Sequence, residues 1–394
     1  MIKRITLVFA IIASLAIMSC SDSKTETTLN SSQAIQGELT GVAEEVASAP
    51  GAVAMDKNMP VLDYLPFAMP VKNINETLGK IETNEKLAQV NIVRNLFPKE
   101  NEASKQEDHF VFTDHLGTYT CTSITTETDS TGAVNVIDSD WISDLGGSNI
   151  TIIVPANVAL DGKEFRMVLN NYEDEFIDYY DEYQDYYSDY FTTLVDLDVF
   201  VSGTNVLALD FNADWEYMVA MEDVMPKYLN LTLTMTPFTL TITYSQDVNV
   251  LSYSINLKKN SITRMDFSTQ ITFTDATLEE VDQIAVQYTF GVYKIDFWAD
   301  NDLETIMNSN DYTLQQQVDI LNGGDYIWAN VYKNNVIIGA LQAKIVWDPK
   351  EWNEETQSYG AYVVVPYIKF TDGSEMALED FVALFAEYSE YMGK

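Results

Sequence analysis

The sequence predicts an α+β fold that consists mainly of antiparallel β-strands, arranged as a sandwich or as a curved open sheet. Three observations predict this class. Apolar and polar residues alternate over long runs after His109, turn residues separate these runs, and few long helical patterns interrupt them. A helical segment before the strands and an amphipathic helix after them complete the predicted architecture.

The clearest alternation lies between residues 229 and 257. Leucine and methionine alternate with asparagine and threonine over 229–236, and the same period of two continues over 238–245 and 251–257. Such alternation gives one buried and one solvated face, as is usual in antiparallel sheets. Turn residues separate the runs at Ser202-Gly203-Thr204-Asn205, Lys259-Asn260, Asn334-Asn335 and Asp372-Gly373.

Helical spacing flanks the predicted strands. Residues 55–108 form a helical and irregular segment, which is broken by prolines at first and then keeps helical spacing over 74–97 until Pro98. At the other end, apolar residues with helical spacing predict an amphipathic helix: Leu378, Phe381, Leu384, Phe385, Tyr388 and Tyr391.

The β-rich body, residues 109–394, contains one short internal match. Residues 206–214 (VLALDFNAD) align with residues 292–300 (VYKIDFWAD). The match predicts two related lobes, 109–275 and 276–394, and a chance similarity between strands is the alternative.

The N-terminus has the organisation of an export signal. Lys3 and Arg4 precede an apolar stretch over 5–17, which is shorter than the ~20 residues that a membrane-spanning helix needs. Ile17-Met18-Ser19-Cys20 resembles the lipobox of bacterial lipoproteins. The resemblance implies that residues 1–19 are a signal peptide and that Cys20 carries fatty-acyl chains such as palmitate. An ordinary secretory signal is the alternative.

The resemblance also implies a cellular location. Ser21 follows Cys20, where an aspartate would retain a lipoprotein in the inner membrane, so we expect a lipid anchor in the outer membrane. The periplasmic or surface side stays open. Residues 20–54 are rich in Ser, Thr, Ala, Gln and Glu without a sustained apolar period, and they are predicted to form a flexible acylated tether.

The charge balance limits the partners of the chain. The 394 residues contain 22 Lys+Arg and 60 Asp+Glu, and removal of Lys3 and Arg4 with the signal leaves a net charge of 20 − 60 = −40. Such a chain repels nucleic acid and anionic headgroups, so we expect no nucleic-acid partner and contact with the bilayer through acylated Cys20 alone. Cations, neutral glycans, apolar ligands and basic proteins are compatible partners.

The most unusual segment is Tyr172–Leu194, which places seven tyrosines among eight carboxylates. As a helix it would bury one aromatic stripe against the sheet and expose its acids: Phe176, Tyr180, Tyr183, Tyr187, Tyr190 and Leu194 share the buried face. The functional hypothesis is an exposed aromatic and acidic patch that stacks on sugars or engages a basic partner. Its candidate ligand-binding residues are Tyr179, Tyr183 and Tyr186.

A second candidate is the D-x-N-x-D sequence of Asp210, Asn212 and Asp214. Calcium prefers oxygen ligands, which alternate residues of a loop can supply, so these three are a speculative Ca²⁺ site. The EF-hand pattern does not continue, because Trp215 stands where the loop needs glycine. On a strand the three residues would instead face water together.

Cysteine and histidine suggest little further chemistry. Once Cys20 is acylated, only Cys121 remains, and a lone cysteine in an alternating stretch is expected in the core. The two histidines, His109 and His115, would lie nearly 20 Å apart on a strand, too far to share a metal, and His115 is expected at the surface.

We therefore predict a non-enzymatic binding or structural module of the cell envelope, for a glycan or a protein, without catalytic residues and without a cofactor other than the speculative Ca²⁺. A lipid carrier with one open apolar sheet face is the first alternative. The motifs H-E-x-x-H, G-x-S-x-G, G-x-G-x-x-G and the phosphate loop are absent. A glycosidase needs only two placed carboxylates, so a glycoside hydrolase is the second alternative.

Overall fold

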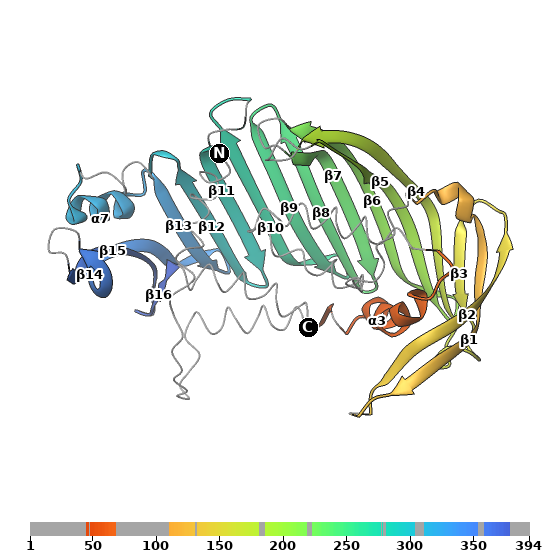
Figure 1. Ribbon diagram of the computed structural model, residues 1–394. Coiled ribbons are helices and arrows are strands. Elements are labelled where there is room, and N and C mark those ends of the chain that lie inside the picture. The colour runs from red at the N-terminus through yellow and green to blue at the C-terminus, as the bar shows by residue number, and fades with distance from the viewer. Residues whose placement is uncertain are drawn as a thin grey trace. The chain divides into compact units, whose positions relative to one another are not determined.

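Figure 1 shows the computed structural model, which describes residues 45–46, 48–67, 110–130, 132–180, 186–218, 223–276, 278, 281–303, 311–353 and 358–378. The signal peptide, Cys20, the helical pattern over 74–97 and the C-terminal helix beyond Leu378 lie outside these residues.

Sixteen strands make up most of the described chain. They are β1 (Gly117–Thr128), β2 (Val134–Leu145), β3 (Ile150–Val154), β4 (Phe165–Tyr180), β5 (Tyr186–Val201), β6 (Thr204–Met218), β7 (Asp223–Met235), β8 (Phe238–Asp247), β9 (Val250–Lys259), β10 (Ile262–Phe273), β11 (Val281–Phe290), β12 (Tyr293–Asp300), β13 (Ile327–Lys333), β14 (Val336–Asn353), β15 (Ser358–Phe370) and β16 (Glu375–Ala377).

The strands form one sheet in the order β16-β15-β14-β13-β12-β11-β10-β9-β8-β7-β6-β5-β4-β3-β1-β2. β1 and β3 pair in parallel. Antiparallel pairing joins strands that are consecutive in sequence, for example β4 with β5 and β11 with β12. The prediction of a β-rich, mainly antiparallel fold is confirmed.

The chain divides into two compact units. The described residues of the N-terminal unit fall within Val42–Ser245 and Ile255–Ile262, and those of the C-terminal unit within Gln246–Ser254 and Thr263–Tyr388. The division therefore falls around β8 to β10, ahead of the lobe boundary at residues 275 and 276 that the sequence suggested.

The core follows the alternation of the sequence. On β7, Leu229, Leu231 and Leu233 are fully buried, while the threonines and asparagine between them are partly exposed. The same pattern holds on β8 and β9. Strand alternation alone therefore identified the buried face correctly, because successive side chains of a strand point to opposite sides of the sheet.

The predicted turns are also present. Ser202 and Gly203 both have positive φ, of 49° and 80°, between β5 and β6. Asn334 and Asn335 have φ of 50° and 63° between β13 and β14. Positive φ at both central positions matches the right-handed twist of the flanking strands, and asparagine and glycine tolerate it best.

Packing begins earlier along the chain than the sequence suggested. Helix α3 (Pro50–Leu62) starts within residues 20–54, which were assigned to the tether, and it continues through Pro60. Val46, Ala49 and Ala54 are at most 6% exposed. Small and aliphatic side chains let this short segment lie close to β2, β6 and β7, within the N-terminal unit.

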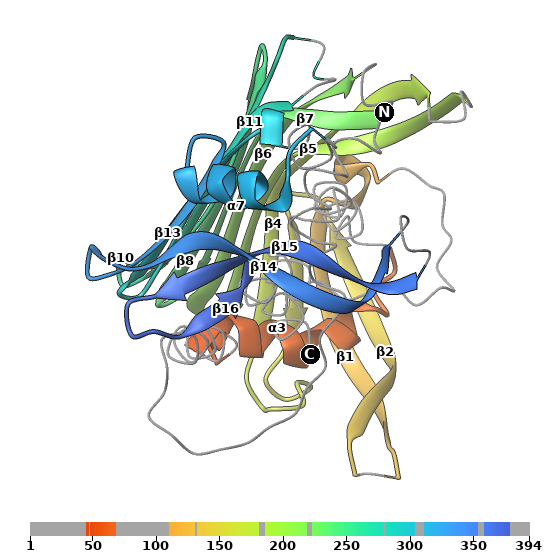
Figure 2. The same cartoon turned by 90° about the vertical axis from the view of Figure 1, so that its left-hand side faces the viewer.

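A second helix, α7 (Leu314–Gly323), was not predicted. It packs against β14 and β15 within the C-terminal unit (Figure 2). Thr313 and Gln316 form a capping box at its start, and Gly324 ends it with φ of 77°. This pairing of Thr with Gln three residues later, followed by a terminal Gly, is a helix signal that could have been read from the sequence.

Candidate functional site

The Tyr172–Leu194 segment is a hairpin of two long strands, so its interpretation as a helix is wrong. β4 pairs with β5 in antiparallel register from Phe165↔Val201 to Tyr180↔Tyr186. Tyrosine and phenylalanine favour strands, where each ring gains a cross-strand partner. Aromatic residues at intervals of three and four resemble one face of a helix. In the hairpin the same residues lie on both faces of the strands, so their helical spacing is a coincidence.

The three candidate tyrosines are distributed over the hairpin. Tyr179 lies opposite Tyr187 and Tyr186 lies opposite Tyr180 in the backbone register. Tyr183 falls outside the described residues, as do the side chains of Tyr179 and Tyr186. Tyr179 and Tyr186 are therefore not directly paired, and their positions in the register belong to opposite faces of the hairpin.

The structure adds two residues that the helical interpretation had assigned to the buried face. Phe176 and Tyr190 are paired across β4 and β5, and their ring centroids lie 4.9 Å apart. Phe176 is 52% exposed and Tyr190 is 36% exposed. We name this pair, with the exposed carboxylate of Asp178 two residues along β4 on the same face, the hairpin patch.

The base of the hairpin holds the patch in place. Tyr172 is 4% exposed, and its hydroxyl donates to a carboxylate oxygen of Asp174 at 3.2 Å. Thr192 is fully buried, and its carbonyl oxygen accepts from Nε1 of Trp215 on β6 at 2.8 Å. At the exposed end, the Ser188 hydroxyl donates to Asp178 at 2.6 Å across the two strands. These contacts fix the hairpin strands to β6 and to each other.

The electrostatic setting of the hairpin patch is uniformly negative along the chain. No lysine, arginine or histidine occurs between Arg166 and Lys227, whereas carboxylates recur throughout that interval. Arg166 itself lies over the ring of Phe200, with its guanidinium carbon 4.4 Å from the ring centroid. A cationic partner would therefore meet exposed rings and carboxylates together.

Asp210, Asn212 and Asp214 lie on β6 and not in a loop. All three side chains are exposed and share the solvated face of the strand. Alternate residues of a strand are ~6.6 Å apart, so Asp210 and Asp214 are separated by roughly 13 Å along β6. Among the residues that the structure describes, no group of three or more His, Cys, Asp or Glu is arranged to hold a metal ion.

The short internal match falls on equivalent strands. Asp210 and Asp214 on β6 correspond to Asp296 and Asp300 on β12, and in each strand the two acids lie on the face opposite the core. Leu209 and its counterpart Ile295 are both buried. The match therefore reflects one strand pattern used in both units.

Cys121 is a core residue, as the sequence predicted. It is 1% exposed on β1, and burial raises the pKa of its thiol. His115 is placed differently from the prediction, in a 3₁₀ turn (Phe112–His115) rather than on a strand. Its ring is partly buried and stacks on Phe67 and Phe110 at centroid distances of 4.6 and 5.1 Å. His109 lies outside the described residues.

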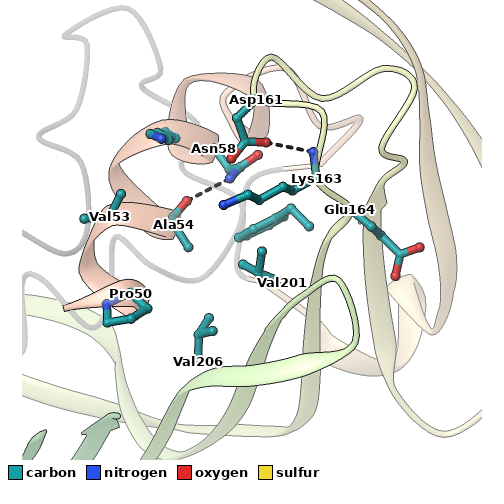
Figure 3. Close-up of a pocket in the computed structure, with 11 residues that line it drawn as sticks. Pro50, Val53, Ala54, Asn58, Asp161, Lys163, Glu164, Val201 and Val206 are labelled. Atoms are coloured by element: carbon teal, nitrogen blue, oxygen red, sulfur yellow. Dashed lines mark hydrogen bonds between the residues drawn. The ribbon is translucent and has the colours of Figure 1, made fainter. Parts of the chain in front are cut away.

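One small pocket lies between α3 and the turn before β4 (Figure 3). Asn58 is bonded within α3, where Nδ2 donates to the Ala54 carbonyl oxygen at 2.8 Å. The backbone N–H of Lys163 donates to Asp161 at 3.0 Å, and the Lys163 side chain extends toward α3 while Glu164 points away. The side chains of Asn58 and Asp161 therefore organise the local backbone at the pocket.

The comparisons with known proteins add no relatives. No family model matches the chain, and neither a curated protein nor a solved structure matches it. Within the described residues, no helix has the length and apolar character needed to cross a membrane.

Proposed function

We propose that the protein is a non-enzymatic binding module, anchored by acylated Cys20 in the outer membrane, that recognises a basic segment of another protein. The observation that supports this function is the hairpin patch: Phe176 and Tyr190 are exposed side by side in a stretch of chain that contains only acidic charges. Contiguous exposed apolar side chains rimmed by polar residues are typical of interaction sites.

The chemistry of the hairpin patch favours arginine over lysine. A guanidinium group stacks on an aromatic face and binds a carboxylate through two parallel hydrogen bonds. Phe176 and Tyr190 supply the faces, and Asp178 is exposed two residues from Phe176 on the same face of β4. A net charge of −40 on the mature chain would also attract a basic partner over a distance before contact.

The anchor completes the proposal. Several acyl chains hold a protein in a bilayer stably, because each buried methylene contributes about 0.8 kcal/mol. The residues from Cys20 to the packed segment at Val46 would then act as a tether that carries the sheet away from the membrane. The side of the outer membrane that the protein faces follows from its sorting and not from its fold.

A curved open sheet is the form that we propose for the strand order, because β16 and β2 are the terminal strands and are not neighbours. The chain after Leu378 is proposed to form the amphipathic helix that its apolar spacing indicates.

The lipid-carrier alternative gains no support. It requires an open apolar face on the strands around β7 to β9, but Leu231, Ile242 and Ile255 are each at most 1% exposed. A carrier would leave such residues accessible until lipid bound them.

The test is calorimetric titration of the full chain with two peptides of equal positive charge, one rich in arginine and one rich in lysine. We expect tighter binding of the arginine peptide. The double variant Phe176→Ala/Tyr190→Ala should weaken that binding about tenfold, because each cation–π contact contributes ~0.5–1 kcal/mol at an exposed site.

The matched control is Tyr362→Ala, which removes a 62% exposed ring on β15, in the other unit. It should leave the affinity unchanged. Two results would contradict the proposal: the double variant binds the peptide as tightly as the native chain, or the control loses as much affinity as the double variant. Either result would show that general charge attraction, and not the hairpin patch, binds the peptide. The triple variant Tyr179→Ala/Tyr183→Ala/Tyr186→Ala extends the test to the hairpin end.

A further inference from the structure

The geometry points to a second binding surface, on the outer face of β11, β12 and β13 in the C-terminal unit, for a neutral glycan. This face lies opposite the buried residues Ile295 and Val331. We name it the glycan face, and its members are Gln287, Asp296, Asn330, Tyr332, Trp298 and Trp328.

The register places these side chains in rows across three strands. Gln287, Asp296 and Asn330 are directly paired and form a polar row. Two residues further along β12, Trp298 is directly paired with Trp328 of β13, and the two form an aromatic row. Two residues in the other direction along β12, Lys294 is paired with Tyr332. The register is continuous along β12, so these side chains share one face.

The polar row is organised by its own contacts. Nε2 of Gln287 donates to a carboxylate oxygen of Asp296 at 3.1 Å, and Nζ of Lys294 lies 2.9 Å from the other carboxylate oxygen. The ammonium of Lys294 also lies 5.5 Å from the centroid of the Tyr332 ring. The amide of Gln287 and the carboxylate of Asp296 are therefore oriented before any ligand arrives, while Gln287 itself is exposed to solvent.

The composition of the glycan face matches the chemistry of a sugar ring. A pyranose presents C–H groups on its faces, which pack on aromatic rings, and hydroxyls at its edge, which bond to amides and carboxylates. Trp328 is 37% exposed, so its ring is accessible for packing. The tryptophan pair on one side of the polar row and Tyr332 on the other supply rings for packing, and the polar row supplies hydrogen-bonding groups between them.

The charges on the glycan face favour a neutral ligand. Lys294 neutralises Asp296 locally, whereas the chain as a whole carries a large negative charge. An anionic polysaccharide would be repelled by the negative charge of the molecule, and a basic peptide would find the carboxylate of Asp296 already paired with Lys294. A neutral glycan avoids both penalties.

The spacing of the rings favours several linked sugars over one. Tyr332 and Trp328 are four residues apart on β13, which corresponds to roughly 13 Å along the strand. A single pyranose ring cannot contact both, but a short oligosaccharide laid along β13 can. Neutral polysaccharides should therefore be bound more tightly than their monosaccharides.

The experiment is affinity electrophoresis of the full chain in gels that contain one soluble polysaccharide each: a linear β-glucan, an α-glucan, a mannan, a galactomannan, and the anionic polygalacturonate. We expect at least one neutral polysaccharide to retard the protein and polygalacturonate not to do so. Trp328→Ala should weaken the retarding interaction about tenfold, because tryptophan is among the residues whose truncation costs most binding energy.

Two further variants separate binding from stability. Gln287→Ala removes an exposed amide from the polar row and should weaken retardation while the melting temperature stays unchanged. Phe176→Ala/Tyr190→Ala lies in the other unit and should bind the polysaccharide normally, so failure of the peptide-binding proposal and failure of this one are distinguishable.

Two outcomes would overturn the inference. The first is the absence of retardation by every neutral polysaccharide tested. The second is retardation that persists unchanged in folded Trp328→Ala and Gln287→Ala variants. Either outcome would mean that the paired tryptophans stabilise the sheet through cross-strand contact without binding a glycan.

Discussion

At the residue scale, burial of hydroxyl and thiol groups is the clearest physical consequence of the packing. Cys121 and Tyr119 lie on the core side of β1, and burial raises the pKa of each. Tyr244 on β8 is 5% exposed, and its hydroxyl has no hydrogen-bond partner within the described structure. Burial raises the pKa of Tyr244 well above its ordinary value of 10.0.

This burial makes stability fall at alkaline pH. The unfolded tyrosine ionises near pH 10, while the folded one stays protonated, so the stabilising difference is present below about pH 10 and is lost as pH rises further. We expect Tyr244→Phe to flatten the fall in melting temperature above about pH 10. At neutral pH it should preserve or raise stability, by up to ~1 kcal/mol, because an unsatisfied hydroxyl is removed.

Thermal unfolding followed by circular dichroism across this pH range measures the effect. Tyr362→Phe is the control, since its side chain is 62% exposed. An identical alkaline loss in the native chain and in Tyr244→Phe would contradict the assignment of that loss to Tyr244.

At the element scale, helix α3 shows how closely the chain packs before the predicted end of the tether. A Cβ on Gly51 would collide with the Val206 carbonyl oxygen on β6 and would lie 3.3 Å from Cβ of Leu207. Glycine is therefore required by the close approach of the helix to the strand, although alanine is favoured in an isolated helix by about 1 kcal/mol.

Gly51→Ala should accordingly destabilise the protein, by ~1–3 kcal/mol, in spite of its better helix propensity. Urea unfolding of the variant measures the change in the free energy of unfolding. Val53→Ala, at a 38% exposed position of the same helix, is the control and should have a small effect. A stabilised Gly51→Ala variant would mean that α3 does not pack on β6 in solution.

The hairpin of β4 and β5 and helix α7 show why some elements were predicted correctly from the sequence and others were not. Strands with strict alternation, such as β7, were predicted because their apolar residues recur every two positions, a spacing that fits a strand and not a helix. The aromatic spacing in β4 and β5 fitted a helix as well as a strand, and only the pairing of Phe176 with Tyr190 decides between them. In α7, short length and low apolar content hid a helix that its capping residues indicated.

At the scale of the whole molecule, the proposed anchor and the charge would act together. Acyl chains on Cys20 would hold the protein at the membrane, while a net charge of −40 on the mature chain would keep the body away from anionic headgroups. Membrane association should therefore depend on one residue. This dependence distinguishes a lipid-anchored protein from one that binds the bilayer through its surface.

Cys20→Ser should move the protein from the membrane fraction to the soluble fraction and abolish labelling with a palmitate analogue. Cys121→Ala, which changes the buried cysteine on β1, should leave both unchanged. Continued membrane association of Cys20→Ser at high ionic strength would contradict the lipid anchor and would point to a secretory signal with a different mode of attachment.

The sequence by itself determined the β-rich, mainly antiparallel character of the fold, the buried face of the central strands and the core position of Cys121, because alternation of side chains is a local property that the backbone of a strand imposes. It also predicted a lipid-anchored address. The tertiary structure decided which strands are neighbours, and therefore which side chains meet. The exposed pair of Phe176 and Tyr190 and the pair of Trp298 and Trp328 each join residues that are separate in sequence. Such pairs depend on strand register, which is set by contacts across the sheet and not by either strand alone.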